Sequence, residues 1–162
     1  MRLGVISDTH GFLRREVLEV FSQVDHILHA GDIGSPEILE ALETLAPVTA
    51  VYGNVDEDDI RRRCPAVQEL ELEGLNIVVT HGDRVKGGLS PDALHEAFPD
   101  AELIVHGHTH VPMLTLIDEV VTVLNPGAAG KVRLRPLASV AIMELEAGLP
   151  PRGRIVPLTE KS

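Results

Sequence analysis

Five short apolar runs in this chain end in the same way, in polar residues beside a glycine. The residues at the ends of the runs are Asp8-Thr9-His10-Gly11, Gly31-Asp32, Gly53-Asn54-Val55-Asp56, His81-Gly82-Asp83 and Gly107-His108-Thr109-His110. Short apolar runs bounded by glycine are typical of buried strands. In an open α/β sheet, ligands collect beyond the carboxyl ends of the strands. The pattern therefore predicts an α/β fold in which five strand ends converge on one site.

The first half of the chain alternates between strand and helix patterns. We expect strands at 1–7, 26–30 and 48–52, with helices at 12–23 and from Ser35-Pro36 onward. A short charged helix is expected at 56–63. The β-α-β-α-β order implies parallel strands joined by right-handed crossovers.

The second half of the chain is rich in strand patterns and contains one predicted helix, at 91–98. A hairpin with a turn at Glu73-Gly74 is expected first, and we predict antiparallel pairing for this half of the chain. The expected strands are 67–73, 75–80, 103–105, 111–117, 120–124, 139–145 and 153–157. The whole is predicted to be a two-sheet α/β sandwich. A length of 162 residues fits a single domain, 1–162.

Composition narrows the classes of partner. A net charge of −11 and only four aromatic residues argue against binding of long nucleic acids. A small phosphorylated substrate stays open, because bound divalent cations would reverse the local field. The sequence shows no secretion signal pattern and no apolar run long enough to span a membrane, so a cytoplasmic protein without membrane partners is expected. The single cysteine, Cys64, is assigned to packing.

The predicted strand ends supply a set of nitrogen and oxygen ligands. These candidate metal ligands are Asp8, His10, Asp32, Asn54, His81, His108 and His110. They exceed what one tetrahedral zinc uses and suit two ions that share a carboxylate, although histidines satisfied by solvent or core are the alternative. Two such ions would clamp a phosphoryl group, which indicates phosphate ester hydrolysis. His26, His29 and His95 are assigned to structure or surface. Arg61-Arg62-Arg63 are assigned to a solvated helix end, with a phosphate-contacting patch as the alternative.

Taken in order, the motifs Asp8-x-His10, Gly31-Asp32, Gly53-Asn54-x-Asp56, His81-Gly82 and Gly107-His108-x-His110 resemble the five blocks of the calcineurin-like metallophosphoesterase superfamily, in particular its small prokaryotic phosphodiesterase branch. The resemblance implies a four-layer αββα sandwich of two mixed sheets. It places Asp8, His10 and His110 on one metal, Asn54, His81 and His108 on a second, and Asp32 between them. It also implies a phosphodiesterase with two divalent ions, manganese first and iron, nickel or zinc as alternatives, and attack by a metal-bridging hydroxide.

The resemblance assigns the catalytic work to Asp32, Asn54, His81 and His108, and a loop-ordering role to Asp56. One position departs from many members of the superfamily, which carry histidine where this chain has Val55, so the general acid is unassigned. A non-catalytic scaffold, like the relative in the retromer complex, and a metal store are the alternative functions. The complete ligand set favours an enzyme. A homodimer or higher homo-oligomer stays open.

Overall fold

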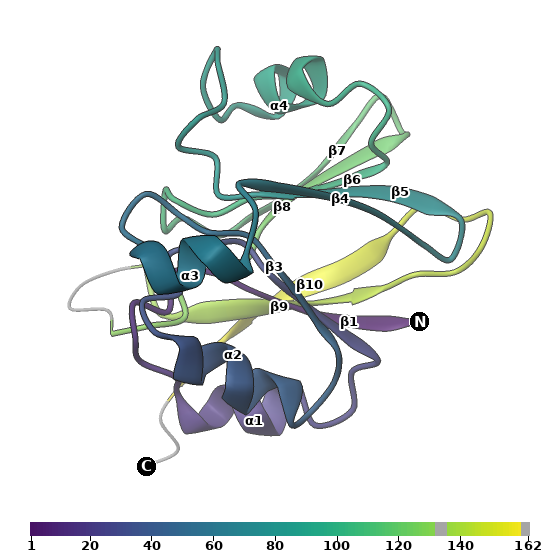
Figure 1. The fold of residues 1–162 in the computed structure, drawn as a ribbon. Coiled ribbons are helices and arrows are strands. Elements are labelled where there is room, and N and C mark those ends of the chain that lie inside the picture. The colour runs from purple at the N-terminus through teal and green to yellow at the C-terminus, as the bar shows by residue number, and fades with distance from the viewer. Residues whose placement is uncertain (132–135, 160–162) are drawn as a thin grey trace.

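The computed structural model describes residues 1–131 and 136–159 (Figure 1). The strands are β1 (Arg2–Ile6), β2 (His26–His29), β3 (Val48–Ala50), β4 (Val67–Leu72), β5 (Leu75–Thr80), β6 (Leu103–Val105), β7 (Met113–Ile117), β8 (Val121–Asn125), β9 (Ser139–Glu144) and β10 (Arg152–Pro157). The helices are α1 (Arg15–Val20), α2 (Pro36–Glu43), α3 (Asp58–Arg63) and α4 (Pro91–Ala97). That residues 1–162 form a single domain stays a prediction.

The first sheet has the strand order β10-β9-β1-β2-β3. Strands β1, β2 and β3 are parallel, as the β-α-β-α-β pattern predicts. Strands β9 and β10 come from the end of the chain and pair antiparallel beside β1. The carboxyl ends of β1, β2 and β3 therefore lie at one edge of this sheet.

The second sheet has the order β4-β5-β6-β8-β7. Its β4–β5 hairpin turns at Glu73 and Gly74, whose φ angles of 52° and 74° suit a tight two-residue turn. The prediction of antiparallel pairing in this half is wrong for β5, β6 and β8, which are parallel. The loop after β6 reverses the chain, and the β7–β8 hairpin reverses it again, so β8 runs in the same direction as β6.

Successive side chains of a strand point to opposite faces of its sheet. The buried apolar side chains therefore form three layers, one between the two sheets and one on the outer face of each sheet. Leu3 and Val5 of β1 face Ile77 and Leu103 between the sheets, while the adjacent Ile6 faces the helices. Helices α1 and α2 cover the outer face of the first sheet, and α4 covers that of the second (Figure 1). The predicted αββα sandwich of two mixed sheets is confirmed.

Two helices begin later than the sequence pattern predicts. Helix α1 starts at Arg15, because the amide of Phe12 donates to the carbonyl of Thr9 and residues 9–12 form a turn. Helix α3 starts at Asp58, because the Asp56 carboxylate is occupied by backbone amides of neighbouring loops. Both loops thereby stay free to present polar side chains beyond the strand ends.

Candidate metal centre

The carboxyl ends of β1, β2, β3, β5 and β6 meet at one edge of the sandwich, and the seven predicted ligands lie together there. Within the described residues, two groups have ligand atoms close enough to share an ion, namely Asp8, His10 and His110, and Asp8, Asp32 and His81. All their ligand atoms lie within 4.8 Å of one another in each group. Contacts among the side chains extend both groups to the remaining predicted ligands.

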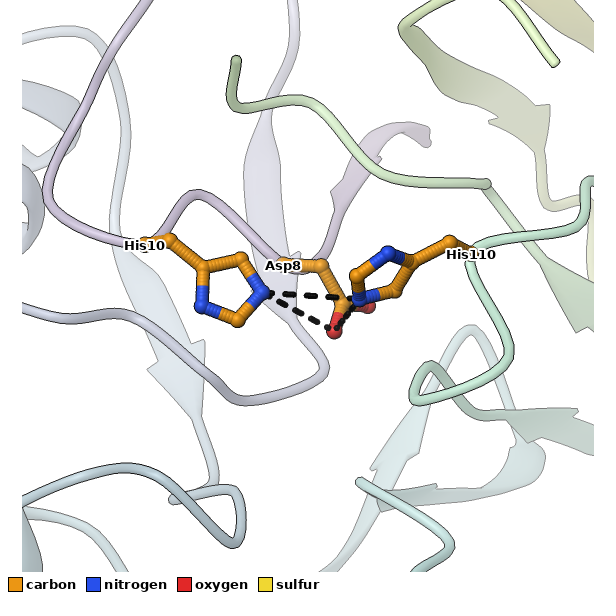
Figure 2. A group of neighbouring side chains, drawn as sticks. All are labelled: Asp8, His10 and His110. Atoms are coloured by element: carbon orange, nitrogen blue, oxygen red, sulfur yellow. Dashed lines mark hydrogen bonds and ion pairs between the residues drawn. The ribbon is translucent and has the colours of Figure 1, made fainter. Parts of the chain in front are cut away.

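The first group joins Asp8, His10 and His110, with the two imidazoles directed toward the carboxylate and toward each other (Figure 2). Asp8 Oδ1 lies 3.0 Å from His110 Nε2 and 3.8 Å from His10 Nε2. The two imidazole nitrogens are 3.4 Å apart. Asp8 Oδ2 accepts the Ser7 hydroxyl at 2.6 Å and the His108 amide at 3.2 Å. The buried Oδ1 has no backbone or hydroxyl donor and faces the two histidines.

Asn54, His81 and His108 form a second cluster, which shares His81 with the group of Asp8, Asp32 and His81. Asn54 Oδ1 lies 3.0 Å from His81 Nε2 and 3.1 Å from His108 Nδ1, and these two nitrogens are 3.3 Å apart. Asp32 stands between the groups, because its Oδ2 is 3.2 Å from His81 Nε2 and 3.8 Å from His10 Nε2. This arrangement of nitrogen and oxygen atoms without thiolate fits two divalent ions of intermediate hardness.

The electrostatics of the centre favour cations. Burial by itself lowers the pKa of His81, but the Asp32 carboxylate and other anionic neighbours outweigh it and raise the pKa overall. The hydrogen bond to Asp8 raises the pKa of His110. Burial would raise the pKa of Asp32, yet its bonds to His81 and to the Val55 amide lower it. The field that draws protons to these imidazoles would equally attract a metal ion.

The backbone of the ligand loops is strained. Five predicted ligands have left-handed φ angles, namely Asp8 (54°), His10 (48°), Asp32 (52°), His108 (69°) and His110 (60°). In the part of the chain that the structure describes, only three other non-glycine residues do so. A left-handed residue costs roughly 1–2 kcal/mol, and such strain gathers at functional sites.

Two glycines permit the close approach of these loops. A Cβ atom on Gly53 would lie 2.0 Å from Asp32 Oδ1, and one on Gly107 would lie 2.1 Å from Ser7 Oγ and 2.8 Å from Asp8 Oδ2. Any larger residue would push the carboxylates away from the imidazoles. These two glycines are therefore required by the packing of the ligands themselves.

His29 holds two ligand loops in place. The Thr9 hydroxyl donates to the Ile33 carbonyl, so it accepts from His29 Nε2 at 3.0 Å, and His29 Nδ1 accepts the Gly31 amide at 3.2 Å. Thr9 lies between two predicted ligands, and Gly31 directly precedes a third. Burial lowers the pKa of His29 to about 4 and keeps the ring neutral. The structural assignment of His29 agrees with these contacts, which also give the ring a positioning role.

Asp56 ties the Asn54 loop to the loop after β2. Its carboxylate accepts the amides of Ile33, Gly34 and Gly53 at 3.1, 2.8 and 2.8 Å. Buried carboxylates that accept several amides are strong local anchors. The loop-ordering role expected for Asp56 agrees with this geometry.

The arginines of α3 differ from the predicted solvated helix end. Arg61 donates to the Asp56 and Asn54 carbonyls at 2.6 and 3.4 Å, and its guanidinium lies 4.7 Å from the Tyr52 ring centroid. Arg63 pairs with Glu43 at 2.7 Å. The prediction is wrong for Arg61, which supports a ligand loop through its backbone.

The sequence pattern assigned no role to the Asn125 side chain. The buried Asn125 amide donates to the Gly107 carbonyl at 3.0 Å and to Thr109 Oγ1 at 2.9 Å, and its oxygen accepts the Gly127 amide. These bonds hold the residues on either side of His108. An asparagine directly after an apolar strand was the available signal.

Other histidines lie outside the ligand set. His106 is buried behind the centre, with Nδ1 facing the Gly107 carbonyl, and His26 contacts Thr49 Oγ1 at 2.8 Å at the far end of β2. His95 is half-buried on α4 and its Nδ1 atom is buried, so its assignment to the surface holds only in part. Val55, at the position where many superfamily members have histidine, is 52% exposed at the mouth of the site.

Comparison with known families gives a match over residues 1–148 to the model of the calcineurin-like phosphoesterase superfamily domain. The chain belongs to this superfamily. The resemblance inferred from the five motifs is thereby confirmed. The superfamily implies divalent metals, and the two ligand groups of this phosphoesterase domain are suited to hold them.

Relatives of this phosphoesterase domain agree with the assignment. A protein named probable metallophosphoesterase from Methanocaldococcus jannaschii is 35% identical, covering 99% of this chain and 83% of its own length. A phosphodiesterase from the same organism is 29% identical over 78% of this chain and 83% of its own length.

A solved structure shares the fold of the phosphoesterase domain. Vps29 from Entamoeba histolytica, crystallised with zinc, superposes with a TM-score of 0.79 at 21% identity over 97% of this chain and 99% of its own. Among the described residues, no helix is both long and apolar enough to cross a lipid bilayer.

Proposed function

We propose that this phosphoesterase is a phosphodiesterase that uses two divalent metal ions. The observation that supports the proposal most directly is the pairing of two ligand groups around one carboxylate, Asp32. The phosphodiesterase among its relatives adds support for a diester substrate. The net reaction adds water across one P–O ester bond and releases an alcohol and a phosphomonoester.

The residues of the site divide the work. Asp8, His10 and His110 would hold one ion, and Asn54, His81 and His108 would hold the other, with Asp32 shared. When bound, two such ions supply a hydroxide at neutral pH and neutralise the phosphoryl oxygens. The chain supplies their spacing through buried carboxylates and loops fixed by amide bonds. Manganese is the first candidate, with iron, nickel and zinc as alternatives.

Partners and substrate size follow from charge. The chain carries −11 net charge, which disfavours long nucleic acids but leaves small phosphorylated molecules that the ions can attract. A homodimer or higher homo-oligomer stays within the proposal and is tested by light scattering. No membrane partner is proposed.

The test uses protein stripped of metal and reloaded with manganese. Turnover of a chromogenic phosphodiester, measured beside the matching monoester, should return only when metal is restored. Binding of two ions with no turnover of either ester would instead favour a non-catalytic metal-binding scaffold. Turnover that survives rigorous metal removal would contradict the proposal.

A further inference from the structure

An exposed aromatic ring next to the metal centre has two cations against it. Phe12 lies two residues beyond His10 and is 37% exposed. Lys131 Nζ is 4.9 Å from its ring centroid, and Arg14 Cζ is 5.8 Å from it. Both distances are in the range of cation–π attraction. We call Phe12, Arg14 and Lys131 the basic rim.

The basic rim is fixed to the strand that carries the first ligands. The amides of Ala129 and Gly130 donate to the carbonyls of Ser7 and Asp8 at 2.9 and 3.1 Å. Arg14 Nε in turn donates to the Gly130 carbonyl at 3.1 Å. Two segments distant in sequence therefore run side by side, and the residues that carry both cations adjoin the backbone of Asp8.

These two cations have no carboxylate partner in the described ranges 1–131 and 136–159, in a chain with 25 acidic residues. Arg14 is half-buried, and one of its five guanidinium donors is used by Gly130. Two like charges gathered on one ring repel each other, and an anion beside them would remove that cost. The rim therefore has the charge and the free donors of an anion site.

A second aromatic ring at the centre, Tyr52, also has two cations beside it, but these cations are bonded to other groups of the protein. Arg61 beside it is bonded to two backbone carbonyls, and Arg84, 5.3 Å from the ring, lies 3.7 Å from Asp83. Those cations already have partners in the protein. The free cationic donors next to the ligands are on the Phe12 side.

We propose that the basic rim binds a second phosphate group of the substrate, apart from the phosphodiester that is cleaved. This inference rests on the proposed phosphodiesterase function and narrows its substrate class to diesters that carry a further phosphate, as a nucleoside bisphosphate ester does. The Arg14 guanidinium matches two phosphate oxygens, and the Lys131 ammonium adds a point charge. The Phe12 ring keeps the two cations close to each other.

The test compares two chromogenic diesters that differ only by this group. One is the p-nitrophenyl ester of thymidine monophosphate, and the other carries an additional phosphate on the second sugar hydroxyl. For manganese-loaded protein, the extra phosphate should lower KM by about tenfold, the value of one charge-assisted contact. The double variant Arg14→Gln, Lys131→Gln should lose this preference and keep kcat for the simpler ester within about twofold.

The control is the double variant Arg62→Gln, Arg154→Gln, which removes the same two positive charges from exposed residues of α3 and β10 and should keep the preference. If the ratio of the KM values for the two esters is the same in wild type and the Arg14→Gln, Lys131→Gln double variant, the basic rim does not bind the second phosphate. Calorimetric binding of thymidine bisphosphate against thymidine monophosphate, in manganese buffer, supplies a readout without turnover. If neither ester is cleaved, the proposed function fails, but the calorimetry still tests phosphate binding by the basic rim. A preference of the wild type for the bisphosphate that the Arg14→Gln, Lys131→Gln double variant loses supports such binding. Equal affinities of the wild type for the bisphosphate and the monophosphate contradict it.

Discussion

His29 offers a direct way to measure how much a buried, neutral histidine contributes to the stability of this fold. Burial lowers its pKa from 6.5 to about 4, while in the unfolded chain the ring regains its ordinary value. Between these two values the unfolded chain binds a proton that the folded protein does not. The free energy of unfolding should therefore be unaffected at neutral pH and fall as the pH drops below 6.5.

The size of the loss follows from the two pKa values, 6.5 and about 4. Each pKa unit corresponds to about 1.4 kcal/mol, and at about pH 5 the unfolded ring is almost fully protonated while the native ring is almost fully neutral. The difference between about pH 7.5 and about pH 5 then comes to about 2 kcal/mol. His29→Gln removes the titrating ring, so this part of the pH dependence should disappear.

The pH dependence of the free energy of unfolding is measured by urea unfolding in the presence of a chelator, at both pH values. At neutral pH, His29→Gln should cost about 1–3 kcal/mol, because the Gly31 amide loses its acceptor. Between neutral and low pH, the variant should then lose about 2 kcal/mol less free energy of unfolding than the wild type loses. Nearby charges such as Asp56 and Asp8 are common to both proteins and cancel in the comparison.

His26→Gln is the matched control on the same strand. His26 is half-buried and bonds Thr49, and burial lowers its pKa as well, so removal of this ring should change the pH dependence less than removal of His29. If His29→Gln and wild type lose the same stability toward low pH, the buried neutral state of His29 is refuted. His29→Asn repeats the comparison if the glutamine variant does not fold.

Three further predictions concern the metal centre. Asp32→Asn should abolish diester turnover with unchanged circular dichroism, because both ligand groups lose their shared carboxylate; wild-type rates in metal-replete variant would contradict the assignment. Asn125→Ala should weaken manganese binding or turnover by about 10–100-fold, because the His108 loop loses both bonds from the Asn125 amide. Unaltered manganese affinity in a calorimetric titration, together with normal turnover, would count against this positioning role. Val55→His should speed hydrolysis of diesters with poor alkyl leaving groups by about 10²-fold more than p-nitrophenyl esters; equal effects on both would remove position 55 from proton transfer to the leaving group.

Much of the ligand arrangement was predictable because it is encoded locally. An apolar run that stops at a glycine and a polar residue marks a strand end, and parallel strands bring such ends to one edge. The direction of β8 was not predictable in this way, because a buried parallel strand and a buried antiparallel strand have the same apolar pattern. The hydrogen-bond partners of β8 depend on how the loop after β6 turns.

The supporting contacts were beyond sequence reasoning for a related reason. The partners of His29 lie at Thr9 and Gly31, and the cations on Phe12 come from residues 14 and 131, so no periodicity relates them. Arg61 was misread because its charge pattern fits the end of a helix dipole equally well. Only the packed loops show that its guanidinium donates to the carbonyls of Asn54 and Asp56.

The distribution of ligands between the sheets explains why the strained loops persist. Each group takes residues from both sheets: Asp8 and His10 follow β1 whereas His110 follows β6, and Asn54 follows β3 whereas His81 follows β5. Left-handed backbone survives only where surrounding contacts hold it in place. Here the buried Asp8 carboxylate, bonded to the amide of a loop from the other sheet, supplies such a contact. The same bonds that hold the two sheets at this edge therefore also set the spacing of the candidate ligands.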